Sequence, residues 1–108
     1  MSRSVERAAA NEDAFRNANE EIDRTRGRLG LSERRTPYIC ECEEEKCTDV
    51  LLLTLTDYRY VRSSGRRFVL SPGHQNESDI LLTEGDGFFV IEKTGAEGDL
   101  VEQKASPT

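Results

Sequence analysis

Tyr38-Ile39-Cys40-Glu41-Cys42-Glu43-Glu44-Glu45-Lys46-Cys47 is the stretch that decides how this chain folds, because it holds all three cysteines of the 108-residue sequence. The single histidine, His74, follows 27 residues after Cys47, directly behind Pro72-Gly73. Three thiols and one imidazole make one tetrahedral ligand set, and closed shells of three Cys and one His are a common type of structural zinc site. The pattern therefore predicts a zinc ion held by Cys40, Cys42, Cys47 and His74.

The C-x-C-x4-C spacing leaves alternatives open. A strand is expected from Tyr38, with Cys40 and Cys42 on one face, so both could instead be small core residues. Cα atoms two apart on an ideal strand are roughly 6.7 Å apart, so zinc binding requires the backbone around Glu41 to bend. Cys47 favours the metal site because it lies in a charged turn. An acidic residue or water is the alternative fourth ligand.

The composition allows only a small core, since 33% of the residues are charged, 35% are hydrophobic and Trp is absent. The formal net charge of −6 disfavours bulk binding to nucleic acid or anionic membranes. The sequence contains no signal-peptide pattern and no apolar run of membrane-spanning length. A cytoplasmic protein is expected, and in that reducing compartment clustered cysteines are more often metal ligands than disulfides.

The chain divides into three predicted parts. Residues 1–36 are expected to form a long helix over 4–29 and a polar linker, with Gly30 ending the helix. Residues 37–93 are expected to form a small zinc-binding domain. Residues 94–108 are interpreted as a disordered acidic tail because they lack bulky apolar side chains.

The predicted fold class is α+β: the long N-terminal helix is followed by a three- or four-stranded, mostly antiparallel sheet with one or two short helices, stapled by zinc. The apolar run 50–55 is expected to be the central, best-buried strand, followed by a short helix with Thr56 as its N-cap. Ile80-Leu81-Leu82 is interpreted as one helical turn. The glutamates of the cysteine turn are expected to be solvated. Further strands are predicted over 67–70 and 88–93.

The N-terminal helix carries a narrow apolar stripe in which Phe15, Ile22 and Leu29 recur every seven residues. A helix of about 25 residues with one apolar face needs a docking surface. Its own sheet, a second copy of the chain and another protein all remain open, and the stripe is the predicted recognition surface. A second candidate surface is basic and aromatic, a composition that suits RNA, and includes Arg59, Arg62 and Arg66.

Several of these features resemble a family of short uncharacterised bacterial proteins. The shared residues are Asn11-Glu12, Phe15-Arg16, Asn19-Glu20, Ile22, the three cysteines, Leu55-Thr56, Tyr58, Pro72-Gly73-His74, Val90 and Glu92-Lys93. The resemblance covers roughly residues 11–93 and departs between the second and third cysteine, where related chains tend to have Gly, Asp and Pro. It implies the helix-then-sheet architecture and brings no activity with it.

The function expected from the sequence is a small, non-enzymatic zinc-binding module that acts through protein contacts. One histidine, no nucleophile motif and no Gly-rich phosphate loop leave catalysis without the necessary groups. Two alternatives remain: an RNA- or ribosome-associated factor that uses the arginine-rich strips, and a redox sensor whose thiolates release zinc on oxidation.

Overall fold

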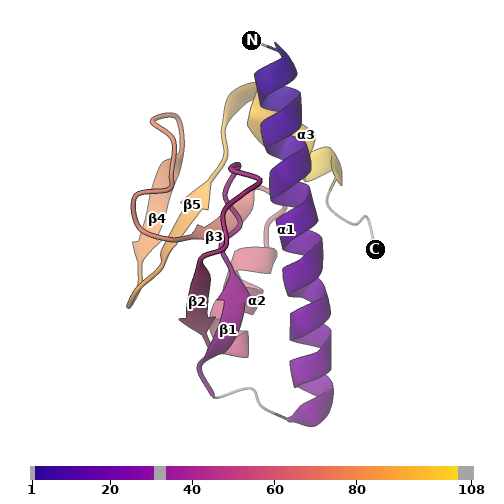
Figure 1. Ribbon diagram of the computed structural model, residues 1–108, viewed down its shortest axis with the longest axis vertical. Helices are drawn as coiled ribbons and strands as arrows, with labels where there is room; N and C mark the ends of the chain where they lie inside the picture. The colour runs from indigo at the N-terminus through magenta and orange to yellow at the C-terminus, as the bar shows by residue number, and fades with distance from the viewer. Residues whose placement is uncertain (1, 31–33, 105–108) are drawn as a thin grey trace.

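The structure, a computed structural model, describes residues 2–30 and 34–104, with side chains from residue 6 onward. Helix α1 (Ser2–Leu29) runs along the whole molecule, and two small antiparallel sheets lie to one side of it (Figure 1). The first sheet pairs β1 (Thr36–Ile39) with β2 (Val50–Leu53). The second has the strand order β3 (Arg67–Leu70), β5 (Phe89–Glu92), β4 (Ile80–Glu84).

Two further helices complete the fold. Helix α2 (Leu55–Arg62) connects the two sheets, and α3 (Gly95–Lys104) packs beside α1 (Figure 1). The predicted α+β class with a long N-terminal helix is confirmed, although the strands form two sheets rather than one. The prediction of a disordered tail is wrong over α3, while residues 105–108 and 31–33 lie outside the described residues.

Three local predictions are wrong. The run beginning at Val50 is an edge of a two-stranded sheet, with Val50 and Leu52 exposed, rather than the best-buried strand. The N-cap of α2 is Thr54, whose hydroxyl accepts from the Asp57 N–H while the Asp57 carboxylate accepts from the Thr54 N–H, forming a capping box. Residues 80–84 form strand β4 and not a helical turn.

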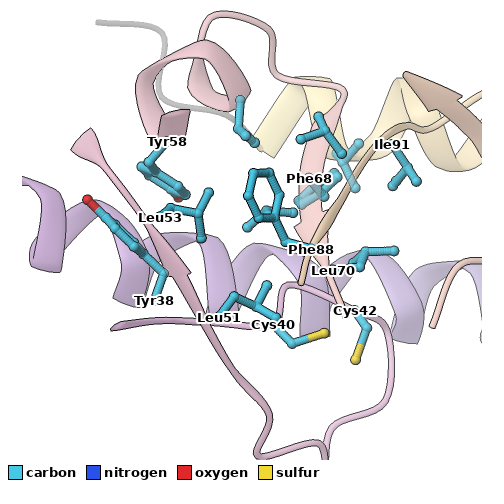
Figure 2. Packing of buried hydrophobic residues seen from close by; sticks show 14 of the residues in the cluster. Tyr38, Cys40, Cys42, Leu51, Leu53, Tyr58, Phe68, Leu70, Phe88 and Ile91 are labelled. Atoms are coloured by element: carbon cyan, nitrogen blue, oxygen red, sulfur yellow. The ribbon is translucent and has the colours of Figure 1, made fainter. Parts of the chain in front are cut away.

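The core is small and lies between the first sheet, α2 and the second sheet. The rings of Tyr38 and Tyr58 stack with their centroids 4.7 Å apart. Cys40 and Cys42 lie at one edge of the cluster (Figure 2). The largest fully buried apolar side chains are Tyr38, Tyr58, Phe68, Leu53, Leu55, Leu70 and Ile91.

Helix α1 docks on this body mainly through a polar stripe, to which Ala9 and the half-buried Ile22 add apolar contacts. Glu12, Arg16 and Asn19 follow one another on one side of the helix, and each is 0% exposed. Burial of polar side chains is unfavourable unless each finds a partner. These three residues therefore have to be matched by specific groups on the body.

Arg16 and Asn19 show how specific that matching is. The Arg16 guanidinium donates to the carbonyls of Gly65 at 2.8 Å and Val101 at 2.9 Å, and it lies over the Phe68 ring. The Asn19 amide donates to the Ile39 carbonyl and accepts from the Ile39 N–H, both at 2.8 Å. Asn19 thus binds the backbone of β1 in the way that a neighbouring strand would.

Asn19→Ala is expected to lower the free energy of unfolding by about 2–4 kcal/mol, because it leaves the buried polar groups of Ile39 unpaired. Asn17→Ala is the matched control, since Asn17 is exposed on the same helix and its substitution should change stability by less than about 0.5 kcal/mol. Urea denaturation followed by circular dichroism measures both. Equal effects of the two substitutions would show that α1 is not held by this pairing.

Candidate metal centre

The three cysteines and the histidine predicted as ligands converge at one place. One ligand atom from each of Cys40, Cys42, Cys47 and His74 lies within 4.8 Å of all the others. His74 Nδ1 is 3.5 Å from Cys40 Sγ and 3.7 Å from Cys47 Sγ. The cysteines are free thiols. This cluster could hold one metal ion.

Cys40 and Cys42 reach the cluster because the chain changes sheets between them. Strand β1 ends at Ile39, so the prediction that both cysteines lie on a strand is wrong. The Cys40 N–H donates to the Asp49 carbonyl beside the first sheet, and the next N–H, of Glu41, donates to the Val69 carbonyl in the second. This change of partner supplies the bend that zinc binding was expected to require.

His74 is returned to the cysteines by a tight turn. The His74 N–H donates to the Ser71 carbonyl at 3.0 Å, closing a turn around Pro72-Gly73 directly after β3. Gly73 has a φ of 95°, a conformation that favours glycine, and Pro followed by such a Gly is typical of a type II turn. The predicted role of Pro72-Gly73 in returning His74 is confirmed.

Two residues outside the predicted set support the ligands. The Ser71 N–H donates to Cys40 Sγ at 3.2 Å, which stabilises negative charge on that sulfur. Asp49 Oδ2 lies 3.4 Å from His74 Nε2 and accepts from the Ser71 hydroxyl at 2.9 Å. A carboxylate facing Nε2 favours the tautomer in which Nδ1, the nitrogen beside the sulfurs, is free to bind metal.

The protonation of the thiols is coupled. A hydrogen bond between the Cys40 and Cys42 thiols, opposed by burial, lowers the pKa of Cys42 to about 5. The same hydrogen bond and burial raise the pKa of Cys40 above its ordinary value. The ligand atoms lie within 4.8 Å of one another, and a bound cation would stabilise the thiolate form of such closely spaced sulfurs.

The cysteine turn is tied to its surroundings on both sides. The Asn11 side chain on α1 donates to the Glu43 carbonyl at 2.8 Å, and Asn76 donates to the Glu43 carboxylate. The Cys47 N–H donates to the Glu44 carbonyl at 3.0 Å and closes the turn. The position of Cys47 is therefore set by contacts of the turn, and its half-buried side chain also packs against the core cluster.

Glu41 is the clearest departure from the sequence analysis, which placed it among solvated glutamates. Its side chain is 0% exposed. Its carboxylate accepts from the Tyr58 hydroxyl at 2.6 Å, the Asn19 amide at 2.9 Å and the Val69 N–H at 3.1 Å. The carboxylate also faces the Arg62 guanidinium at 3.6 Å. The residue between the two cysteines is thus a buried junction of α1, α2 and β3.

The arginines of the second predicted surface mostly serve the fold. Arg62 is nearly buried, and Arg66 pairs with Asp99 and Glu102 of α3. Only Arg59 of the three is largely exposed, and it lies 3.5 Å from Asp23. A nucleic acid that approached Arg62 or Arg66 would have to compete with these internal partners.

The residues of the predicted helical stripe differ in exposure. Phe15 is half-buried, Ile22 is half-buried and packs against the core cluster, and Leu29 is 65% exposed. None of the three belongs to the buried stripe that docks α1. The stripe therefore retains an apolar surface after the chain has folded.

A second group of acidic residues surrounds Lys93. Glu12, Glu43 and Glu97 bring carboxylate oxygens within 4.8 Å of one another. Lys93 Nζ lies 2.6 Å from Glu12, 3.0 Å from Asp79 and 3.6 Å from Glu97, and its side chain is 2% exposed. Because the Lys93 ammonium already lies among these carboxyl groups, the cluster is a structural polar network that joins α1 and α3 to Lys93, directly after β5.

Comparison of the chain with protein-family models, with curated proteins and with solved structures finds no match. The resemblance based on the sequence motifs therefore stays a prediction. Among residues 2–30 and 34–104, no helix has the length and apolar character needed to cross a membrane.

Stability is expected to depend on pH through Glu12. Burial, partly offset by Lys93, raises the pKa of Glu12 from 4.5 to about 9. A raised pKa gives a stabilising contribution that is complete below pH 4.5 and is lost as the pH rises through 9. Relative to Glu12→Gln, the wild-type free energy of unfolding should fall between pH 5 and 9 by at most about 1.4 kcal/mol per pH unit.

Urea denaturation of both proteins at several pH values measures this difference, and the comparison cancels the pH dependence of the cysteines. Glu6→Gln is the control, since Glu6 is exposed on the same helix. A wild-type minus Glu12→Gln difference that does not change with pH would contradict the assignment.

Proposed function

We propose that this protein is a small, non-enzymatic interaction module whose fold is closed by one structural zinc ion at Cys40, Cys42, Cys47 and His74. The observation that carries the proposal is the spacing of the ligand atoms. A tetrahedral zinc ion with ordinary bond lengths separates sulfur from nitrogen by about 3.6 Å. In the structure, Cys40 Sγ and Cys47 Sγ lie 3.5 and 3.7 Å from His74 Nδ1.

The donor set also supports zinc. Soft thiolates together with an imidazole in a four-donor cluster suit Zn²⁺, whereas Mg²⁺ and Ca²⁺ prefer oxygen ligands. Four protein ligands leave no open position for a reacting water, and this favours a structural role over a catalytic one. Thiolates of this kind persist in a reducing compartment such as the cytoplasm.

The arrangement suggests what the ion would do. Cys40 and Cys42 lie where the chain passes from the first sheet to the second, Cys47 lies in the turn before β2, and His74 follows β3. An ion at this point would join both sheets, which share only a small core. Removal of the ion should therefore loosen the contact between the sheets.

Purified protein is expected to contain one zinc per chain by elemental analysis. A strong chelator should lower the melting temperature by about 10 °C or more, because each 1 kcal/mol lost corresponds to about 4–8 °C in a domain of this size. Cys47→Ser should show the lower melting temperature without chelator, and chelator should not lower it further. The proposal would be contradicted if the purified protein contains no zinc and if neither chelator nor Cys47→Ser changes its melting temperature.

A second variant tests whether the contact between Asp49 and His74 supports metal binding. Asp49→Ala removes the carboxylate facing His74 Nε2 and should weaken zinc binding about 10- to 100-fold. Asp86→Ala is the control, because Asp86 is exposed and pairs with Arg35, and neither residue is a ligand of the cluster. Competition with a chromophoric chelator measures both affinities. Equal affinities in the two variants would remove Asp49 from the site.

The alternatives derive less support from the contacts. An RNA-binding role would have to recruit Arg62 and Arg66, which the fold already uses. Redox-dependent zinc release stays a prediction.

A further inference from the structure

We infer that two copies of this chain associate through the C-terminal half of α1, side by side and antiparallel. The inference rests on the proposed interaction role, but it does not depend on the metal site. It begins from an open groove of about 660 Å³ on this half of the helix. The described residues that line the groove are Ala18, Glu21, Ile22, Thr25, Arg26 and Leu29.

The spacing along the groove is that of a helix that packs against another helix. Phe15, Ala18, Ile22, Thr25 and Leu29 alternate in steps of three and four residues. This alternation is the repeat of coiled coils, in which one helix inserts its side chains between those of a second.

The body of the same chain covers only part of this face, through Ile22, which is half-buried against the core cluster. At about 100° per residue, Ala18, Ile22, Thr25 and Leu29 lie roughly 60–120° around the helix axis from the buried Asn19. Leu29 remains 65% exposed and Ala18 is exposed as well. A second helix is the kind of element that would cover a narrow groove of this shape.

The charges beside the groove indicate that the second helix belongs to another copy. Glu21 and Arg28 lie on the same flank, seven residues apart, and both are exposed. In an antiparallel pair that places Ile22 against Thr25 of the second copy, the Glu21 carboxylate faces Arg28 of that copy. Twofold symmetry repeats the contact, so one surface supplies both halves of two ion pairs.

A parallel arrangement is less favourable. It would place Glu21 against Arg26 of the second copy. The Arg26 guanidinium is already held by its own chain, 5.7 Å from the centroid of the Tyr38 ring and 3.4 Å from the Pro37 carbonyl. Arg28 has no such contact among the interactions of the described residues. Glu21 is paired with Arg24 of its own helix in an exposed contact, which either arrangement has to exchange. The antiparallel pairing leaves the contacts of Arg26 intact.

Sedimentation equilibrium of the full chain, from roughly 1 µM to 1 mM, tests the inference. The apparent mass should rise from 12.2 kDa toward twice that value. Leu29→Lys should weaken association at least about tenfold, because it places a charge in the apolar seam. Leu52→Lys is the matched control, since Leu52 is also exposed but lies on β2, and it should leave association unchanged.

Charge reversal tests the orientation. Glu21→Arg or Arg28→Glu alone creates two like-charge contacts and should weaken association about tenfold. The double variant restores opposite charges and should return the dissociation constant to within about threefold of the wild type.

A chain that stays at 12.2 kDa over the whole range, or a double variant no better than the single ones, would overturn the inference. Circular dichroism of each variant checks that it folds. Zinc content measured on the same samples separates a failure of this inference from a failure of the zinc proposal, because no ligand residue is altered.

Discussion

The carboxylate of Glu41 is the constraint on which the rest of the structure depends. It is fully buried, and it accepts hydrogen bonds from α1, α2 and β3 at once. A buried carboxylate left without partners would cost several kcal/mol, so these elements have to arrive together. Since Glu41 lies between Cys40 and Cys42, the same network fixes where both sulfurs lie. Burial, and next the charge of Glu41, raises the pKa of Tyr58, which keeps that hydroxyl protonated as a donor.

The polar face of α1 follows the same principle. Glu12, Arg16 and Asn19 each bind a different part of the body: Lys93 after β5, the Gly65 and Val101 carbonyls, and the backbone of β1. Such contacts contribute little net stability compared with apolar packing, but each requires one alignment of the helix. The helix is thereby held in a single position along a body with a small core. Part of its apolar stripe, including Leu29, remains exposed.

The parts of the fold that local chemistry determines could be predicted from the sequence. The cysteines and His74 were recognisable because their residue types and number match one ligand shell, and Pro72-Gly73 indicated the turn that returns His74. The α1 boundary followed from Gly30, whose φ of 72° is one that glycine favours. Strand β3 followed from its short apolar run between turn residues. These features depend on neighbours in the sequence.

The remainder depends on contacts between distant residues. Periodicity identified Phe15, Ile22 and Leu29 as the apolar stripe of α1 and left its docking partner open. It did not indicate that Glu12, Arg16 and Asn19 would be buried, because no local signal distinguishes a polar residue with a buried partner from a solvated one. A helical turn was predicted for Ile80-Leu81-Leu82, but these residues form strand β4 because they pair with β5. The tail has few bulky apolar side chains, which predicted disorder, yet Val101 is buried and its carbonyl accepts from Arg16, 85 residues away. Glu41 is one of several glutamates around the cysteines, and no local feature of the sequence indicates that it is buried.

The central claim is that this polar network brings three sulfurs and one nitrogen around a single zinc ion. X-ray absorption at the zinc edge of the purified protein tests it most directly, because the method reports the type and distance of the bound atoms. The account predicts three sulfur atoms at about 2.3 Å and one nitrogen atom at about 2.0–2.1 Å. A shell made mainly of oxygen atoms, or one with fewer than three sulfurs, would contradict it.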